Sequence, residues 1–328
     1  YIKMKQKDLL NGYIQHEPFL IEIEPTEGCN LGCHFCGLRG IRKNGTKPWL
    51  HLTVENAKII AEKIAKENWN SRIVFCGHGE PTLNKNLVEI IRVFREVLPK
   101  NPFCLITNGA GFKNGNFEIK KFLNEMEELQ LNSFIMDVYS GNGDWNVLDG
   151  IDREVVVIGH DKVPFNYTKL PMRVALYPMD MDSDHSILRS LSNHCGAAAP
   201  LDFERKNTRC VKPFRELFIR WDGTVALCCD DFRGQYYVEN ALHDISLKDL
   251  WNHPKFQAAR IMLYNGKRTI KPCLGCSCPP VRAGLLPDPS AKDKNVMPEV
   301  TKEIEKVFKS AYKEEGSTTI IRRKWEMK

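Results

Sequence analysis

Two periodicities of apolar residues alternate along the first 140 residues of the chain. Short apolar runs, typical of β-strands, cover residues 19–24, 72–76, 103–107 and 134–138. Apolar residues spaced three or four apart, typical of amphipathic helices, cover residues 53–64, 87–98 and 119–129. Strands that alternate with helices predict βα units and a parallel sheet with right-handed crossovers. The expected fold class is therefore α/β.

The pattern becomes less regular after residue 138. Two more strand-like runs, 153–158 and 172–177, follow after only 14 and 13 residues, which leaves little room for crossover helices. We therefore expect the sheet to be open on this side. A β-hairpin is expected over 217–227, because Asp222-Gly223 at its centre is a strong turn signal. A loop rich in Pro, Lys and Asp at 279–298 should precede a C-terminal amphipathic helix.

Composition narrows the possible functions only a little. The chain of 328 residues is 42% hydrophobic and 27% charged, and it contains no apolar run long enough to span a membrane. Its net charge of +6 is mild, and the one dense basic run, 322–324, resembles a solvated tail more than a nucleic-acid surface. Twelve cysteines without a secretory signal favour metal or cluster ligands over disulfides. We expect a cytoplasmic protein without a membrane or nucleic-acid partner.

The strongest chemical signal is a CxxxCxxC triplet, Cys29, Cys33 and Cys36, directly after the first predicted strand. Three thiolates on one tight loop hold three corners of a cubane iron–sulfur cluster and leave one iron open. A reduced cysteine cluster or half of a zinc site would use the same residues. The next two strands end in Gly77-His78-Gly79-Glu80-Pro81 and in Thr107-Asn108-Gly109. Taken alone, the first of these segments is also compatible with a plain strand-to-helix turn.

Together these segments resemble the sequence pattern of the radical S-adenosylmethionine (SAM) enzymes. The resemblance implies a partial (βα)6 TIM-like barrel with SAM bound to the open iron of a [4Fe–4S] cluster. In the family, the segment at 77–81 aims backbone groups at the SAM amino group, and His78 here replaces its first glycine. The SAM-binding residues that the resemblance implies are Phe35, His78, Gly79, Glu80, Asn108 and Ser140.

A second cysteine group lies in the C-terminal half of the chain. The stretch 210–228, with Gly223 between its cysteines, resembles the opening of SPASM and twitch domains, and a CxxC pair follows at 273–276. The resemblance implies one auxiliary [4Fe–4S] cluster, with the ligands Cys210, Cys228, Cys273 and Cys276. Only Cys229 and Cys278 remain nearby, and we expect both to point elsewhere. A zinc site made from the same four cysteines is the alternative, although zinc ribbons normally pair two CxxC knuckles.

The chain is expected to divide into three parts. These are a radical SAM core at 1–192, an auxiliary cluster domain at 193–282, and a loop, helix and basic tail at 283–328. His194, in the turn between the first two parts, is a candidate proton acceptor beside the substrate. Cys76, at the end of the second predicted strand, is expected to be a buried small hydrophobe.

The resemblance implies an enzyme that cleaves SAM to a 5′-deoxyadenosyl radical, which abstracts a substrate hydrogen atom. A donor such as flavodoxin or ferredoxin would supply the electron. We expect the substrate to be a small polar metabolite, such as a sugar, aminocyclitol or nucleotide, that is oxidised or rearranged. A ribosomal peptide is the alternative, although the 18 residues before the first predicted strand are too few for a leader-binding domain. The second alternative is a non-catalytic zinc- or cluster-binding interaction protein.

Overall fold

The structure is a computed structural model that describes residues 17–33, 35–40, 49–139, 155–157, 173–179, 192–198, 209–210, 212–278 and 300–312. Ser140 and the loop expected at 279–298 lie outside these residues. Among the helices that are described, none is both long and apolar enough to cross a bilayer.

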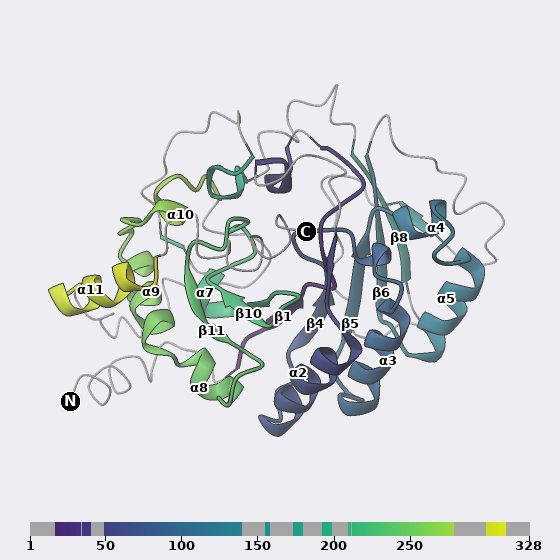
Figure 1. Ribbon diagram of the computed structural model, residues 1–328, viewed down its shortest axis with the longest axis horizontal. Helices are drawn as coiled ribbons and strands as arrows, with labels where there is room; N and C mark the ends of the chain where they lie inside the picture. Colours follow the sequence, from purple (N-terminus) through teal and green to yellow (C-terminus); the bar gives the residue numbers. More distant parts are fainter. Residues whose placement is uncertain are drawn as a thin grey trace, which may run out of the picture.

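One nine-stranded sheet, in the order β11-β10-β9-β1-β4-β5-β6-β8-β7, organises the described part of the chain (Figure 1). Its strands are β1 (Leu20–Ile23), β4 (Arg72–Phe75), β5 (Phe103–Thr107), β6 (Ser133–Tyr139), β7 (Val155–Val157), β8 (Arg173–Met179), β9 (Glu216–Ile219), β10 (Thr224–Ala226) and β11 (Tyr237–Asn240). Six neighbouring strands of this sheet pair in parallel, namely β1, β4, β5, β6, β8 and β7. This arrangement confirms the α/β class and the six parallel strands of a partial barrel. A separate short pair, β2 (Thr26–Glu27) and β3 (Leu50–His51), is antiparallel.

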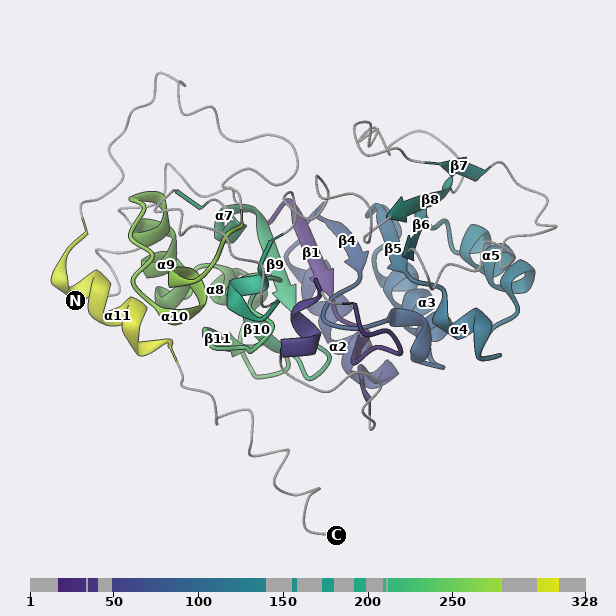
Figure 2. The ribbon, with the colours of Figure 1, turned by 90° about the horizontal axis from the view of Figure 1, so that it is seen from above.

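The expected hairpin forms, and it extends the same sheet instead of standing apart from it. β9 and β10 pair antiparallel around the turn at Gly223, whose φ of 80° favours glycine. On its other side β9 pairs in parallel with β1, although the two strands are nearly 200 residues apart in sequence. Figure 2 shows β10, β9, β1 and β4 in succession across the molecule. The boundary expected at residue 192 stays a prediction, and the two sides of it share one sheet.

Helices flank the sheet (Figure 1). They are α2 (Val54–Lys66), α3 (Leu87–Val97), α4 (Ala110–Lys113), α5 (Ile119–Glu128), α7 (Lys212–Arg215), α8 (Leu247–Trp251), α9 (Pro254–Tyr264), α10 (Lys271–Leu274) and α11 (Lys302–Ser310). Three short 3-10 turns are η1 (Gly37–Gly40), η2 (Pro81–Leu83) and η4 (His194–Gly196). α2, α3 and α5 lie side by side along the parallel strands, whereas α8, α9 and α11 gather around the end near β11 (Figure 1).

Strand alternation decides which side chains reach the interior of the barrel. Ile21 and Ile23 of β1 are fully buried under the helices, as are Leu217 and Ile219 of β9. Because successive side chains of a strand point to opposite faces, Glu22 and its alternate neighbours face inward. The carboxyl ends of these parallel strands, where sites of such barrels lie, carry the first cysteine loop.

Candidate active site

The predicted SAM-binding residues line one pocket at the carboxyl ends of β1, β4 and β5. This cavity has a volume of about 150 Å³ and is open to solvent. The predicted residues in its wall are Cys29, Cys33, Phe35, Cys36, His78, Gly79, Glu80 and Asn108. Cys76 also lines it and is half-buried, so it is not the enclosed core residue that was expected. The structure therefore brings three loops of the chain together around one cavity.

The three thiols of the first loop have the chemistry of cluster ligands. Cys29 Sγ accepts hydrogen bonds from Leu31 N and from Asn108 Nδ2, both at 3.3 Å. Burial, reinforced by nearby negative charge, raises the pKa of both Cys29 and Cys33 to about 12. Their protons are therefore released only when a metal replaces them. Among the described residues, these three thiols do not lie within 4.8 Å of one another, as ligands of a single ion would.

Gly79 allows the 77–81 segment to run directly against the backbone of the cysteine loop. Glu80 N donates to Gly28 O at 2.9 Å, and Gly28 N donates to His78 O at 3.3 Å. A Cβ atom at position 79 would lie 2.2 Å from Thr26 O and 2.5 Å from Gly28 O. Both neighbours are backbone atoms that cannot rotate away. The glycine is therefore required by close packing of two backbones.

Replacing Gly79 by alanine is expected to weaken SAM binding and to destabilise the protein by about 3 kcal/mol, because the new methyl group must displace backbone. Calorimetric SAM titration and thermal unfolding of the reconstituted protein measure the two effects. Gly115→Ala is the matched control, since its added Cβ meets nothing within 4 Å and only its φ of 78° is unfavourable. If Gly79→Ala and Gly115→Ala bind SAM equally well, the close packing does not shape the SAM site.

Glu80 holds the 77–81 segment to the end of β5. Its carboxylate, which is 3% exposed, accepts hydrogen bonds from Thr82 N at 2.9 Å, from Asn108 N at 2.7 Å and from the Thr107 hydroxyl. Burial raises the pKa of Glu80, and these hydrogen bonds oppose the rise. Because its donors come from the protein, the observed role of Glu80 is to position Asn108. Direct binding of SAM by Glu80 stays a prediction.

The His78 side chain points away from the SAM pocket. Its Nε2 lies 2.6 Å from Cys229 O, and its ring stacks on Phe232 with the centroids 4.0 Å apart. Burial, followed by the charge of Arg220, lowers the pKa of His78 well below its usual value, so the imidazole is neutral. The backbone of His78 accepts a hydrogen bond from Gly28 N at 3.3 Å, and its role in binding SAM stays a prediction. The imidazole instead joins the 77–81 segment to the C-terminal region through Cys229 O and Phe232.

The second cysteine group surrounds a separate and smaller cavity. All four predicted ligands line it, namely Cys210, Cys228, Cys273 and Cys276. Two further cysteines, Cys195 and Cys278, line the same cavity. The expectation that Cys278 points elsewhere is therefore wrong, because the chain folds back after the CxxC pair. Cys229 does point elsewhere, toward Glu22 and Glu216.

Cys195 was missed because its segment is distant in sequence from the cysteine pattern. Its thiol makes hydrogen bonds with the thiols of Cys228 and Cys276. The η4 turn that carries it is fastened by Asn193, whose N donates to Ser277 Oγ at 2.8 Å and whose Oδ1 accepts from Ser277 N at 2.9 Å. Cys195 has a left-handed φ of 54°, a conformation that costs a non-glycine residue about 1–3 kcal/mol. The only signal in the sequence was a cysteine inside a turn.

His194 lies between the two cysteine groups. A Cβ atom on Gly37, next to Cys36, would lie 2.7 Å from His194 Cβ, so the histidine packs against the first cysteine loop. Its Nδ1 is 3.4 Å from Asp230 Oδ1, two residues after Cys228. Burial disfavours the Asp230 carboxylate, but the Lys212 ammonium and then His194 hold the pKa of Asp230 well below its usual range. An ionised carboxylate thus stands behind an imidazole at the junction of the two sites.

Comparison with known proteins agrees with this geometry. Residues 23–157 match the profile of the radical SAM superfamily, and residues 210–277 match that of an iron–sulfur cluster-binding domain, SPASM. The S-adenosyl-L-methionine-dependent 2-deoxy-scyllo-inosamine dehydrogenase of Niallia circulans is 27% identical over 258 residues, which cover 76% of this chain and 88% of that enzyme. A GTP 3′,8-cyclase of Pectobacterium atrosepticum is 29% identical over 91 residues, 28% of this chain and 27% of the cyclase.

Solved structures share the fold. The crystal structure of BtrN in complex with AdoMet and 2-DOIA superposes with a TM-score of 0.59 and 24% identity, covering 80% of this chain and 93% of BtrN. BtrN in an open conformation superposes with a TM-score of 0.53 and 22% identity, over 80% and 92% of the two chains. At these identities the likeness supports the architecture, which is a partial barrel followed by an iron–sulfur domain.

Proposed function

Because the chain belongs to the radical SAM superfamily and carries a SPASM domain, we propose that it oxidises a small polar metabolite at a carbon that bears a hydroxyl group. Its cofactors are SAM and two [4Fe–4S] clusters. The observation that carries the proposal is the position of His194, backed by Asp230, between the two cysteine groups. The relative from Niallia circulans, a dehydrogenase whose substrate is an aminocyclitol by name, supports a small substrate over a peptide.

Two sets of residues would hold the clusters. Cys29, Cys33 and Cys36 fit the SAM-binding cluster, and the second cavity fits the auxiliary one. When bound, these groups supply the reductive cleavage of SAM, a 5′-deoxyadenosyl radical that takes one hydrogen atom, and an acceptor for one electron. The protein must still position the C–H bond, exclude water and remove the hydroxyl proton.

His194 is proposed to accept that proton. Conversion of an alcohol to a carbonyl removes one hydrogen atom, one electron and one proton, and the proton needs a base close to the substrate. Nδ1 of the imidazole faces the ionised Asp230, which stabilises the imidazolium after transfer. The side chain is 19% exposed, so one edge of the ring remains accessible. The Lys212 ammonium also forms an ion pair with Asp230, and its positive charge keeps the Asp230 carboxylate ionised.

The source of electrons and the compartment are also part of the proposal. We infer that a low-potential donor such as flavodoxin or ferredoxin reduces the SAM-binding cluster. A reducing cytoplasm suits both oxygen-sensitive clusters and the many free thiols of the chain.

The proposal is tested by anaerobic turnover with SAM, dithionite and a panel of aminocyclitols, amino sugars and polyols. We expect one member to lose two mass units while 5′-deoxyadenosine forms. His194→Ala is expected to lower ketone formation by about 10²–10⁴-fold, and added imidazole should restore part of it. The matched control is His243→Ala, which removes an exposed histidine far from both cavities. Release of 5′-deoxyadenosine with every panel member unchanged in mass would contradict the oxidation.

A further inference from the structure

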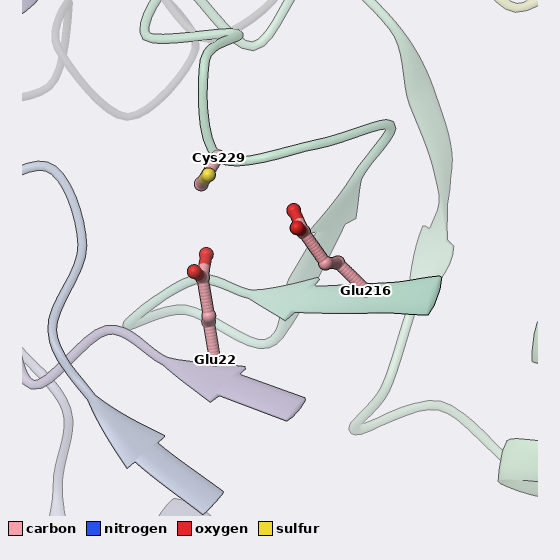
Figure 3. Close-up of side chains that lie close together, drawn as sticks. All are labelled: Glu22, Glu216 and Cys229. Atoms are coloured by element: carbon pink, nitrogen blue, oxygen red, sulfur yellow. The ribbon is translucent and has the colours of Figure 1, made fainter. Parts of the chain in front are cut away.

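A pair of inward-facing carboxylates, which the chemistry above leaves without a role, lies on the inner face of the barrel. Figure 3 shows Glu22 of β1, Glu216 of β9 and Cys229, after β10, pointing toward one another. One ligand atom from each of the three residues lies within 4.8 Å of the other two. We refer to Glu22 and Glu216 as the acidic pair.

The sheet register places the acidic pair below the SAM pocket. β1 lies between β4 and β9, and Ile23 is level with Phe75 of β4, so Cys76 is level with Glu24. Glu22 precedes Glu24 by two residues and faces the same side of the sheet. At a rise of about 3.3 Å per residue, Glu22 lies about 6.6 Å farther from the carboxyl end of β1. Since Cys76 lines the SAM pocket, the acidic pair occupies the same inner face just beneath that pocket.

The positive charges near the acidic pair are shared with other groups, and Arg215 also interacts electrostatically with Glu216. The Lys212 ammonium makes a short ion pair with Asp230, is 3.2 Å from Cys229 Sγ and is 3.9 Å from Glu216 Oε2. It is therefore shared between two carboxylates and the Cys229 thiol. The next inward-facing cation, Arg220, already pairs with Glu24 and with Glu27.

One oxygen of the Glu22 carboxylate lacks a hydrogen-bond donor among the described residues. The carboxylate accepts a hydrogen bond from the Cys229 thiol, but the buried Oε2 atom makes none to any described residue. Burial and the neighbouring Glu216 raise the pKa of Glu22 to about 7. Leaving a buried carboxylate oxygen without a donor costs about 1–3 kcal/mol or more. A donor that carries positive charge would satisfy this oxygen and favour the ionised carboxylate.

We propose that the acidic pair binds a protonated amino group of the substrate. An ammonium group offers three N–H donors and one positive charge, which match the Glu22 oxygen that makes no hydrogen bond to a described residue and the negative charge of the two carboxylates. The Lys212 ammonium, which lies 3.2 Å from Cys229 Sγ, would repel a divalent cation about twice as strongly as it repels a singly charged ammonium group at the same distance. The inference rests on the proposed function and adds to it that the substrate is an amine. The aminocyclitol substrate in the name of the Niallia circulans relative agrees with that class.

The test compares two cyclitols in anaerobic calorimetric titrations of the cluster-loaded protein with SAM. One is 2-deoxy-scyllo-inosamine, and the other carries a hydroxyl in place of its amino group. We expect the wild type to prefer the amine. Glu22→Gln and Glu216→Gln should each raise the Kd of the amine about tenfold or more, and change that of the neutral cyclitol little. Glu22→Asp, which keeps the charge, should recover part of the preference, and Glu89→Gln on the exposed face of α3 should change neither Kd.

Three results would overturn the inference. The first is a wild type that binds both cyclitols equally or binds neither. The second is an equal loss of both ligands in Glu22→Gln, which would indicate a structural role. The third is stoichiometric zinc or manganese that disappears in Glu22→Gln. In each case, the loss of two mass units from a member of the substrate panel is scored separately with the wild type, so failure of the amine site is distinguishable from failure of the proposed oxidation.

Discussion

Replacing Cys29, Cys33 and Cys36 together by alanine is expected to abolish the release of 5′-deoxyadenosine. These are the three thiols that line the SAM pocket from one loop, and without them SAM has no open iron to bind. The wild type, given SAM and dithionite, should release 5′-deoxyadenosine slowly even without substrate. Chromatography of the acid-quenched reaction, performed anaerobically, gives the yield directly.

Iron analysis of the same triple variant provides the control. The wild type should hold about eight irons from two clusters, and the variant about four, because the second cavity is a separate set of ligands. A variant that holds four irons has folded, so its inactivity is then due to the missing cluster. Equal yields of 5′-deoxyadenosine from wild type and variant would contradict the assignment of the SAM site.

Cys228→Ala is expected to lose most or all of the auxiliary iron, whereas Cys229→Ala should keep the full load. The two residues are neighbours in sequence, but Cys228 lines the second cavity and Cys229 faces Glu22 and Glu216. The two variants remove the same type of side chain from adjacent positions, so they form a matched comparison. Iron and sulfide analysis after anaerobic reconstitution, with absorption near 400 nm, distinguishes about eight irons from about four.

Cys195 and Cys278 make the ligand set itself testable. Both line the second cavity, yet both lie outside the matched SPASM region, residues 210–277. We expect Cys195→Ala and Cys278→Ala to retain the auxiliary cluster. If Cys278→Ala loses it and Cys276→Ala keeps it, the ligand set is wrong by one position of the CxxC knuckle. Stoichiometric zinc without sulfide would replace the cluster assignment altogether.

Elements whose signal is local were predictable from the sequence. The period of apolar residues identified the strands at β4 and β5, because each is a short run between two amphipathic helices. Thr53 caps α2 by accepting a hydrogen bond from Asn56 N at 3.1 Å, an interaction that needs only neighbouring residues. The cysteine loop was predictable for the same reason, since its three ligands lie within eight residues.

Features that depend on distant partners were not predictable. The pairing of β9 with β1 joins segments whose apolar patterns are ordinary for many strands, so nothing in either one specifies the other. The orientation of the His78 ring depends on Phe232 and on Cys229 O, which reach it only in the folded chain. Cys195 enters the second cavity through the hydrogen bonds of Asn193 with Ser277, again a long-range contact.

The position of β1 between β4 and β9 has a consequence for how such a protein can be shortened. In the described sheet, one side of β1 is hydrogen-bonded to the radical SAM core and the other to the iron–sulfur domain. Removing the C-terminal half would expose a row of unpaired amide and carbonyl groups along β1. Such an open strand edge is a template for aggregation. The iron–sulfur domain therefore covers the β1 edge of the sheet. A chain that lacks this domain is expected to aggregate, so its loss of function would begin with folding and not with electron transfer.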